Sequence, residues 1–379
     1  MKYDVAVIGL GGMGSAILAQ SAHHGASAIG IEQYQRAHDL GSSHGRSRMF
    51  RKSYFEAPDY VPLLHRASEL WRELEQETGT KLLEPTGVLT VGEETSKIVA
   101  GTKRAAQAHD LPLLSLGRRE MQTRYPSLKL LPDEIALFEE DAGVLNPEEA
   151  VCAHLDWAGA QGAEMRFGIN MTRWHKTDFG FEIALSDGTV TTARTLILAL
   201  GPWFKETLEA LGVPIRIQRN VQVWFEPLGD AYTGQNFPSF LLDRRGLPAP
   251  LYGFPDFGYG VKAAFHGLGQ DTTAGEIDRA IDQKRDLEPL RLSMEDWMPG
   301  AAHRFRHASA CMYTFTPDEH FVIDRHPSHP NLILCGGFSG HGFKFAPVIG
   351  EIVAELAVHG GTRHEVDFLG LGRFLNSHG

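Results

Sequence analysis

The most constraining feature of this chain is a glycine-rich turn close to its N-terminus. A short β-branched run, YDVAVI (residues 3–8), leads at once into GLGGMG (9–14), and residues 15–24 are expected to form a helix. A second strand, AIGIE, is expected at 28–32. Strand, glycine turn, helix and strand at this spacing form a βαβ unit, which opens a Rossmann-like nucleotide-binding domain.

The glycines of this turn have a specific chemical use. Gly9, Gly11 and Gly14 form GxGxxG, which allows a tight turn and lets the backbone approach a pyrophosphate at the helix N-terminus. Glu32 ends the second strand, where an acid accepts a hydrogen bond from a ribose hydroxyl. A turn that is merely rich in glycine is the alternative. The complete unit favours dinucleotide binding.

Later segments of the chain bear on the choice between NAD and FAD. Asp187-Gly188 separates two alternating runs and predicts a hairpin, and the apolar run that follows, ending at Gly201, predicts a buried parallel strand. A glycine-rich strand–loop–helix segment returns near residue 340. An NAD dehydrogenase usually completes its parallel sheet before its substrate domain begins. The interleaved pattern therefore favours FAD, a long cofactor whose ends are held by remote segments.

Charge and composition exclude several function classes. The net charge of −11 disfavours nucleic acid and anionic membrane surfaces as partners. The apolar run from Val5 to Ile8 is too short for a secretion signal, and no stretch of 18 apolar residues is present to span a bilayer. Cys152, Cys311 and Cys335 are too widely spaced for a disulfide framework or a CxxC metal pair, and Cys152 and Cys335 lie in apolar runs that place them in the core. We expect a cytoplasmic protein with no metal site.

A basic loop follows the nucleotide-binding unit. Residues 41–52 read GSSHGRSRMFRK, with four cations within seven residues of an acidic chain. A solvated basic face is one explanation. However, Gly, Ser and His crowd the same loop, and an arginine is suited to two-pronged binding of a carboxylate. We expect Arg48 or Arg51 to bind an anionic group of the cofactor or the substrate.

A second glycine-rich loop, GGFSGHGFK at 336–344, precedes Pro347 and a helix expected at 348–357. Proline near a helix start, with glycines before it, leaves a helix N-terminus open to an anion. A reduced flavin is anionic, so such a helix end would stabilise it. A tight turn with an exposed lysine is the alternative.

Four segments together resemble the monomeric sarcosine oxidase family, whose relatives include the N-methyltryptophan oxidases and the peroxisomal pipecolate/sarcosine oxidases. The segments are GLGGMG, GSSHGRSRMFR, ACMYTFTPDEHFVID (310–324) and GFSGHGFKFAP (337–347). The similarity runs nearly end to end, including YVPLLHRASELWRELE, YGFP and the final helix. The last two motifs are long and specific, so the resemblance supports a detailed set of expectations.

The expected fold class is α/β, with a Rossmann-like FAD-binding domain of the glutathione reductase type and an inserted substrate domain built on a large mixed β-sheet. A chain of 379 residues exceeds what one hydrophobic core usually organises, so two closely joined domains are expected. The FAD-binding domain is assigned residues 1–82, 142–215 and 316–379, and the substrate domain residues 83–141 and 216–315.

The resemblance implies roles for particular residues. Cys311 lies in the CMYT motif, where the family attaches FAD through a thioether to its 8α-methyl group, whereas a lone cysteine beside a strand is more often a small buried hydrophobe. Lys262, in GVKAAFHG, matches the lysine that the family places over the flavin to activate oxygen, whereas an isolated lysine in a strand-like run would otherwise be a surface residue. Arg51 and Lys344 match the pair that holds the substrate carboxylate.

Further matches complete the expected site. Arg48 and His44 match positions close to the flavin that are linked to its covalent attachment and to catalysis. Tyr252, Tyr313 and His266 match polar groups that line the substrate cavity. The remaining expected contacts with the cofactor are Gly9, Gly11, Gly12, Met13, Gly14, Glu32, Ser42, Ser43, Arg48, Gly201, Trp203, Gly337, Gly340, Gly342, Phe343 and Lys344.

The resemblance leaves the substrate open. Bacterial sarcosine and methyltryptophan oxidases tend to read GSHHGDTR where this chain has GSSHGRSR, a form nearer to the peroxisomal branch. Arg46 in place of an acid adds positive charge close to the flavin loop. The candidate substrates are sarcosine, another N-methyl amino acid, and a cyclic secondary amino acid such as pipecolate or proline.

The expected activity is that of a monomeric oxidase. It would oxidise the C–N bond of a small secondary amino acid to an imine, which hydrolyses, and it would reduce O2 to H2O2. One alternative is a flavin dehydrogenase that passes its electrons to a quinone or a protein, and another is a flavin-bearing binding protein without turnover.

Overall fold

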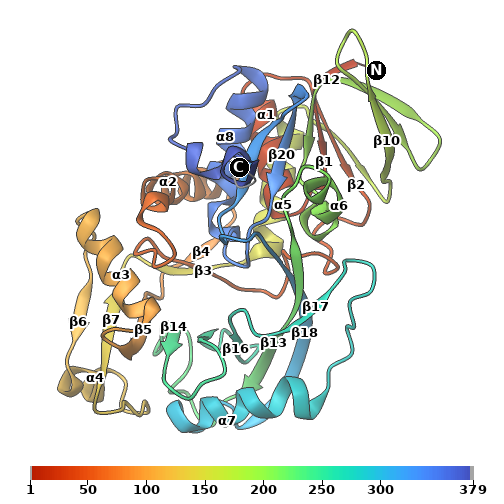
Figure 1. The fold of residues 1–379 in the computed structure, drawn as a ribbon. Helices are drawn as coiled ribbons and strands as arrows, with labels where there is room; N and C mark the ends of the chain where they lie inside the picture. Colours follow the sequence, from red (N-terminus) through yellow and green to blue (C-terminus); the bar gives the residue numbers. More distant parts are fainter. Residues whose placement is uncertain (1, 376–379) are drawn as a thin grey trace.

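The computed structural model describes residues 2–375, so the last residues of the expected segment 316–379 lie outside it. Within the described residues the strands form three β-sheets, of which sheet 1 lies in the upper part of Figure 1 and sheet 2 in the lower part. No helix among residues 2–375 is long and apolar enough to cross a membrane.

Sheet 1 contains the parallel strands that the sequence predicts. Its strands, in order, are β10 (Met171–Lys176), β11 (Phe181–Leu185), β12 (Val190–Leu198), β1 (Lys2–Ile8), β2 (Ala28–Glu32) and β9 (Glu164–Phe167), with β20 (His329–Gly336) beside β12 and β19 (Val322–His326) beside β20. β1 pairs in parallel with β2 and β12, and β12 pairs in parallel with β20. The hairpin predicted at Asp187-Gly188 is confirmed, because β11 and β12 are antiparallel.

Four helices pack beside sheet 1 within the described residues: α1 (Gly12–His23), α2 (Val61–Thr78), α5 (Pro147–Ala160) and α8 (Ala346–Val358). α1 packs against both α5 and α8. A Cβ added to Gly350 of α8 would lie 2.7 Å from the carbonyl carbon of Ala16, so a glycine is needed for this close approach. α2 follows a short 3₁₀ turn, η1 (Pro58–Tyr60), and its C-terminal cap is Gly79 with φ 67°.

Sheet 2 is the large mixed sheet that the sequence predicts. Its strands, in order, are β17 (Gln270–Thr272), β13 (Arg216–Glu226), β16 (Val261–Phe265), β15 (Leu251–Phe254), β14 (Ser239–Asp243), β5 (Val88–Glu93), β7 (Glu134–Glu139) and β6 (Leu114–Leu116), with β18 (Arg304–Phe315) beside β13. β14 and β5 are parallel, and the other pairs are antiparallel. The helices of this part are α3 (Lys97–Ala108), α4 (Arg118–Arg124), the π-helix η3 (Gln283–Leu287) and α7 (Glu288–Trp297).

A small third sheet lies where the two large sheets approach each other (Figure 1). It consists of β3 (Arg48–Phe50), β8 (Gly143–Leu145) and β4 (Leu83–Glu84). β3 carries Arg48, so the basic loop enters the middle of the molecule on a strand rather than on a free coil. The remaining short elements are η2 (Gly201–Phe204), α6 (Lys205–Glu209), η4 (Phe343–Phe345), η5 (Asp367–Leu369) and α9 (Gly372–Leu375).

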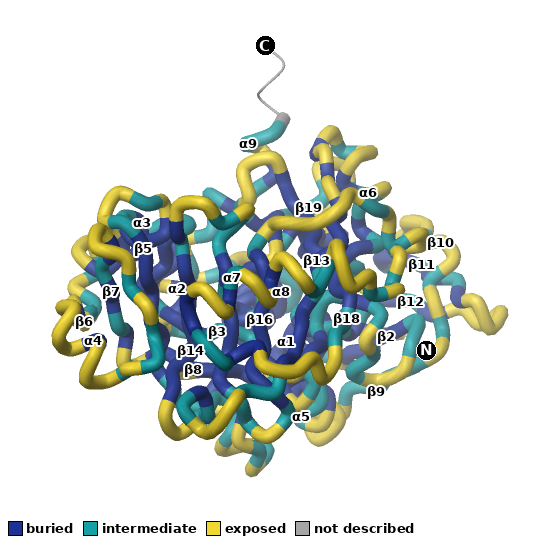
Figure 2. Tube along the Cα trace, turned by 90° about the horizontal axis from the view of Figure 1, so that it is seen from below, coloured by how far each residue is buried: buried dark blue, intermediate teal, exposed yellow. Residues whose placement is uncertain are grey.

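Burial follows this layering. Figure 2 shows buried residues along the central strands and helices, whereas exposed residues gather in the loops and outer turns. Cys335 on β20 is buried, as expected, but Cys152 is only partly buried. The core prediction for Cys152 is wrong because successive residues of α5 point in different directions, and it is the neighbours Val151 and Ala153 that are buried.

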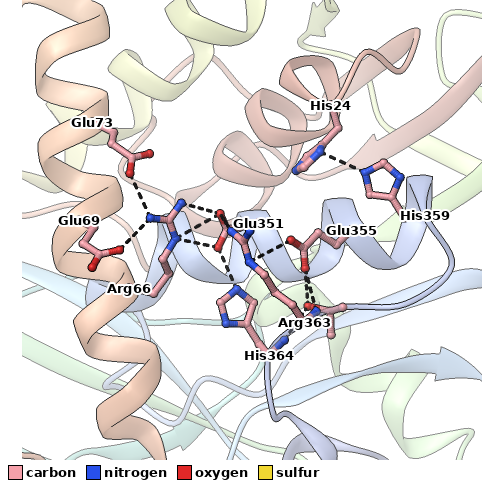
Figure 3. Close-up of polar contacts among 10 residues, drawn as sticks. His24, Arg66, Glu69, Glu73, Glu351, Glu355, His359, Arg363 and His364 are labelled. Atoms are coloured by element: carbon pink, nitrogen blue, oxygen red, sulfur yellow. Dashed lines mark hydrogen bonds and ion pairs between the residues drawn. The ribbon is translucent and has the colours of Figure 1, made fainter.

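A network of charged side chains ties the C-terminal helix to α2 (Figure 3). The buried carboxylate of Glu351 on α8 accepts hydrogen bonds from Arg66 on α2, at 2.8 Å from Nη2 and 3.1 Å from Nε. It also accepts one from Arg363 at 2.6 Å and contacts the ring of His364 at 2.8 Å. Burial alone would raise the pKa of Glu351, but His364, Arg66 and Arg363 outweigh burial and lower this pKa to about 2.

Candidate active site

A cavity of about 410 Å³ is lined by segments of both large sheets. The turn 9–13 after β1 and the end of β2 line one part, while Leu241 on β14 and Tyr252 on β15 line another. The two glycine-rich loops and the basic loop lie along the same cavity. Segments that are remote in the sequence therefore meet around a single space.

Most of the predicted site residues line this cavity. The exceptions are Gly14, His44, Lys262 and Cys311, which are not part of the lining. The predicted residues that do line it are Gly9, Gly11, Gly12, Met13, Glu32, Ser42, Ser43, Arg48, Arg51, Gly201, Trp203, Tyr252, His266, Tyr313, Gly337, Gly340, Gly342, Phe343 and Lys344.

The glycines of the first turn serve two different purposes. Gly9 has φ 89°, and a Cβ on Gly14 would lie 1.7 Å from the carbonyl oxygen of Gly9, so both are needed for the turn itself. A Cβ on Gly11 would have Ser43 Oγ at 3.8 Å as its nearest neighbour, so Gly11 instead leaves room toward the cavity. Open space at the N-terminus of α1 forms a cradle for an anionic pyrophosphate.

Glu32 holds the backbone around this cradle. Its carboxylate accepts the N–H groups of Leu10 at 2.7 Å and Tyr34 at 3.0 Å. Burial alone would raise the pKa of Glu32, but a hydrogen bond from His38 and these backbone N–H groups lower it. An ionised acid therefore stands at the end of β2 on the cavity wall, as a ribose-binding acid would.

Arg48 is fixed by the backbone of its own loop. Its guanidinium donates to the carbonyl oxygens of Ser42 and Ser47, both at 2.8 Å, and to Gln222 Oε1 at 3.4 Å. Arg46 differs from Arg48, because its side chain is exposed and its guanidinium lies 5.0 Å from the ring centre of Tyr259. The charge of Arg46 is thus placed outside the cavity lining.

Lys262 is fully buried rather than on the surface, so the surface alternative is wrong. Its side chain is 1 % exposed, and Nζ donates to the carbonyl oxygens of Gly45 at 2.8 Å and Ser47 at 2.9 Å. Burial, followed by repulsion from Arg48, lowers the pKa of Lys262 well below its ordinary value. The amine stands directly behind the basic loop.

His44 is a buried, neutral imidazole. Burial, followed by the charges of Arg48 and Lys262, lowers its pKa to about 3. Its Nε2 atom has no hydrogen-bond partner among the described residues. A buried polar atom of this kind usually has a partner. His44 follows Ser43, which lines the cavity, but His44 itself is not part of the lining.

Arg51 and Lys344 lie in the same part of the cavity, together with a carboxylate that the sequence did not single out. Nη2 of Arg51 donates to both oxygens of Glu56, at 2.7 and 2.8 Å. Burial alone would raise the pKa of Glu56, but Arg51, His341 and Lys344 lower it to about 2. Burial, followed by repulsion from Arg51, lowers the pKa of Lys344 to about 7. An anion that entered here would meet two cations.

Tyr252, Tyr313 and His266 form a connected polar wall. The hydroxyls of Tyr252 and Tyr313 are 3.2 Å apart, and the rings of His266 and Tyr313 are 5.7 Å apart. Burial raises the pKa of both phenols and lowers that of His266. All three groups are therefore neutral near pH 7, which suits hydrogen bonding rather than charge pairing.

Next to this polar wall lies an apolar patch, of which the sequence singled out only Tyr252. Phe55, Ile98 and Leu241 are buried together, Met49 and Tyr252 pack against them, and all five line the cavity. We call these five residues the apolar wall. The wall touches the cation pair, because the guanidinium of Arg51 lies 4.5 Å from the ring centre of Phe55.

Cys311 lies on β18 at the back of the basic loop. Its thiol is 1 % exposed, and Sγ is 3.8 Å from the carbonyl oxygen of Ser42. Ser42 is held to the same strand, since its Oγ donates to the carbonyl oxygen of Met312 at 2.7 Å. The thiol therefore lies beside two residues that line the cavity, Met312 on its own strand and Ser42 on the basic loop.

The residues present fit a bound FAD. The cavity begins at a glycine cradle with an acid at the end of β2, the arrangement of a dinucleotide site. At its other end it is lined by the neutral polar side chains of Tyr252, Tyr313 and His266. A molecule with a pyrophosphate at one end and a polar ring system at the other matches this sequence of environments.

Glu56 and His341 are the residues that sequence reasoning missed. A single glutamate in the segment YFEAP carries no recognisable signal. His341 lies within GFSGHGFKFAP, so its motif could have indicated it. Its ring is buried and hydrogen-bonded to the hydroxyl of Tyr54. Burial is the main cause that lowers the pKa of His341 to about 3.

Comparison with known proteins agrees with this geometry. The family model described as "FAD dependent oxidoreductase" matches residues 4–356. Monomeric sarcosine oxidase of Streptomyces avermitilis is 43% identical over 96% of this chain and 96% of its own length. N-methyl-L-tryptophan oxidase of Salmonella dublin is 33% identical over 99% of this chain and 100% of its own.

Among solved structures, the open form of NikD, an amino acid oxidase of nikkomycin biosynthesis, superposes with a TM-score of 0.86 at 22% identity, covering 97% of both chains. L-proline dehydrogenase from P. horikoshii gives 0.84 at 22% identity over 99% of this chain and 98% of its own. These two likenesses establish the fold.

Fold and site together define a flavin-dependent oxidoreductase. The chain belongs to the FAD dependent oxidoreductase family and, within it, to the family of the monomeric sarcosine oxidases and N-methyl-L-tryptophan oxidases.

Proposed function

We propose that this chain is an oxidase of a small secondary amino acid, such as sarcosine or another N-methyl amino acid, with O2 as the electron acceptor. The observation that carries the proposal is the pair Arg51 and Lys344, set beside a neutral polar wall in the cavity that begins at the glycine cradle. Bound FAD supplies the two-electron chemistry. The protein supplies orientation, charge and exclusion of water.

The overall reaction balances without any further reagent. An N-methyl amino acid loses two hydrogens, one from nitrogen and one from the adjacent carbon, to give an imine. The two electrons and two protons reduce O2 to H2O2. Water then adds to the imine and releases formaldehyde and the primary amino acid.

Arg51 and Lys344 are proposed to hold the substrate carboxylate. In this structure Glu56 forms an ion pair with the guanidinium of Arg51, so the substrate carboxylate must displace Glu56 from that guanidinium. The exchange gives Arg51 a new carboxylate partner and leaves Glu56 without its ion pair. Orientation of this kind is a recognised source of rate acceleration.

Lys262 is proposed to assist the oxygen half-reaction. A cation next to the site of reduction favours the negative charge that develops on oxygen. A buried amine held by two backbone carbonyls of the basic loop has little freedom to move, which supports this role.

Covalent attachment of FAD through Cys311 is also proposed. The test is the absorption spectrum of the purified protein before and after acid precipitation. Flavin that stays with the pellet in the natural protein, but is washed out of a Cys311→Ala variant, is the expected result. Flavin that washes out of the natural protein contradicts the tether.

The test of turnover is reduction of the bound flavin under anaerobic conditions with a panel of secondary amino acids, followed by admission of air. Bleaching by the substrate and stoichiometric H2O2 in air are expected. Bleaching without H2O2 identifies a dehydrogenase with another acceptor, and no bleaching with any member identifies a flavin-binding protein without turnover.

The apolar wall supports a second candidate, a cyclic secondary amino acid of the pipecolate or proline type. The five residues of the apolar wall would bury more apolar surface of the ring of a cyclic substrate than of the single methyl group of sarcosine. We expect Ile98→Ala to lower kcat/KM for L-pipecolate about threefold to tenfold more than for sarcosine. Lys97→Ala, at the exposed neighbouring position, is the matched control, and equal losses for both substrates contradict the preference.

Three further points stay proposals. The division into an FAD-binding domain (1–82, 142–215, 316–379) and a substrate domain (83–141, 216–315) is supported by the strand composition of sheets 1 and 2. A monomeric state is supported by the names of the sarcosine oxidase relatives. We also propose that the protein works in the cytoplasm.

A further inference from the structure

The segment between β17 and η3 reaches across the molecule to the basic loop. Its Arg279 donates from Nη2 to the carbonyl oxygen of Leu40 at 2.7 Å and from Nη1 to that of Ala310 at 3.3 Å. Leu40 leads into the basic loop, and Ala310 is the residue before Cys311 on β18. One guanidinium therefore bridges the two chain segments that flank the thiol.

Arg279 is itself held in place by a second arginine. Arg219 on β13 is buried, and it donates to the carbonyl oxygen of Asp278 at 2.6 Å and to that of Ala280 at 2.8 Å. Both backbone neighbours of Arg279 are thus fixed by one side chain. Arg219 is in turn paired with Asp286, at 2.9 Å for both hydrogen bonds.

The contacts around Cys311 depend on the same two segments staying together. Cys311 Sγ lies 3.8 Å from the carbonyl oxygen of Ser42, which also accepts Nη2 of Arg48 at 2.8 Å. The bridge made by Arg279 lies two residues before Ser42 in the loop and one residue before Cys311 in the strand. Arg279 is therefore placed to fix the distance between loop and thiol.

We propose that Arg279 is a positioning residue for covalent attachment of FAD to Cys311, because it holds the start of the basic loop against β18. The inference rests on the proposed tether. In that reaction the S–H bond of Cys311 and one C–H bond of the 8α-methyl group break and an S–C bond forms. The two electrons and two protons leave through the flavin to O2, which becomes H2O2.

Bond formation of this kind is sensitive to small displacements. Reacting atoms must approach to about 3–3.5 Å with correct alignment, and an error of about 1 Å costs on the order of a hundredfold in rate. A bridge between loop and strand therefore influences attachment more than it influences reversible binding of FAD. The positive charge of Arg279 also reaches this region, since it contributes to lowering the pKa of His44, after burial, Arg48 and Lys262.

The experiment compares Arg279→Ala, Arg279→Lys and Lys284→Ala with the natural protein. Lys284 is the matched control, because it is an exposed cation in η3, close to Arg279 in the sequence. Each protein is prepared without covalent flavin and given FAD. Reversible binding is followed by flavin fluorescence, and attachment by the flavin retained after acid precipitation over time.

For Arg279→Ala we expect reversible binding within about threefold of the natural protein and attachment at least about tenfold slower. Arg279→Lys should recover part of the rate, and Lys284→Ala should attach at the natural rate. Attachment at the natural rate in Arg279→Ala overturns the proposal. A slower attachment in this variant also overturns it if FAD binding weakens, or the melting temperature falls, to a matching extent.

Asp286→Asn keeps the test decisive if Arg279→Ala does not fold. It leaves Arg279 in the chain but removes the charge that holds Arg219, so attachment should slow by an intermediate factor, and an unchanged rate overturns the proposal. If the natural protein never attaches flavin, the proposed tether to Cys311 is refuted. This outcome differs from a failure of the Arg279 proposal, because it is seen in the natural protein before any variant is measured.

Discussion

At the scale of the residue, the most informative arrangement is a buried carboxylate that already occupies the arginine of the cation pair. Arg51 donates twice to Glu56, and Lys344 lies close enough to lower the pKa of that carboxyl. The binding of a substrate carboxylate is therefore an exchange. Its cost depends on how firmly Glu56 is held.

A Glu56→Gln variant tests this exchange. A neutral amide competes less well for Arg51, so we expect the dissociation constant of a small carboxylate without an amine, such as propionate, to fall about threefold to tenfold. Perturbation of the flavin spectrum measures the binding. Glu69→Gln, an exposed carboxylate on α2, is the control, and an unchanged dissociation constant in Glu56→Gln contradicts competition.

The titration of Lys344 predicts a pH dependence for the same ligand. Burial, followed by Arg51, lowers the pKa of Lys344 to about 7, so the amine is charged below that pH and neutral above it. A bound carboxylate favours the charged form, so binding must take up a proton once the pH exceeds 7. The dissociation constant should be constant below about pH 7 and rise by up to about tenfold per pH unit above it.

A Lys344→Met variant supplies the comparison for this profile. It should bind the carboxylate more weakly and without the rise above pH 7, whereas Lys97→Met, at an exposed position, should keep the natural profile. A flat profile in the natural protein would show that Lys344 does not titrate in this range.

Single residues also mark the limit of what the sequence predicted. Cys311, Arg51 and Lys344 were found through motifs. Arg51 and Lys344 line one cavity, and the thiol of Cys311 lies next to Ser42, another residue of its lining. Glu56 was missed because its importance comes only from folding next to Arg51. Lys262 was identified only through the family motif, because the residues around it in the sequence do not indicate that a lysine would be fully buried.

At the scale of the element, the turn into α1 separates glycines that shape the fold from one that faces the cavity. A Cβ on Gly14 would lie 1.7 Å from the oxygen of Gly9, whereas the nearest neighbour of a Cβ on Gly11 is 3.8 Å away. The same chemical change at two positions of one motif should therefore have different consequences.

We expect Gly11→Ala to fold normally but to bind FAD at least about tenfold more weakly, because the new methyl group points into the cradle. Gly14→Ala should instead lower the yield of folded protein. The measurements are circular dichroism and the flavin content of the purified protein. Normal flavin content in Gly11→Ala contradicts the assignment of the cradle.

Elements with local signals were predicted well. The βαβ unit and the hairpin at Asp187-Gly188 both form where the sequence indicates. The predicted helix at 15–24 begins earlier, at Gly12, because the last residues of the glycine motif already belong to its first turn. The π-helix η3 had no comparable signal, since its backbone follows from the tertiary contacts of its segment rather than from a periodic pattern.

At the scale of the whole molecule, the network around Glu351 joins α2 near the start of the chain to the segment after α8 (Figure 3). The carboxylate has a pKa of about 2, below its ordinary value, because His364, Arg66 and Arg363 outweigh burial. A depressed acid pKa means that the stabilisation is present above the unfolded value of 4.5 and is lost as the pH falls from there toward 2.

A Glu351→Gln variant should therefore lower the free energy of unfolding by on the order of 2 kcal/mol at neutral pH. The difference from the natural protein should shrink as the pH falls below about 4.5. Denaturant unfolding at several pH values measures it. Glu69→Gln, which removes an exposed partner of the same Arg66, should change stability by less than about 0.5 kcal/mol, and equal effects of the two variants contradict a central role for Glu351.

The arrangement of the sheets was predictable in outline from the order of the motifs. Interleaving of the nucleotide-binding segments indicated a discontinuous parallel sheet, and the family resemblance implied the large mixed sheet of the substrate domain. The pairing of β13 with β18 and the crossing of Arg279 to the basic loop were not predictable, because both depend on contacts between distant segments that no local pattern encodes.

The position of β12 has a consequence for synthesis on the ribosome. This strand lies between β1 and β20, which ends at Gly336, and α8 packs on α1. The first strand and helix of the cofactor site are thus completed only by segments that the ribosome makes long after them. The growing chain must keep its βαβ unit unfinished until β20 and α8 have been translated, and a product truncated before β20 has no complete site through which added FAD would rescue it.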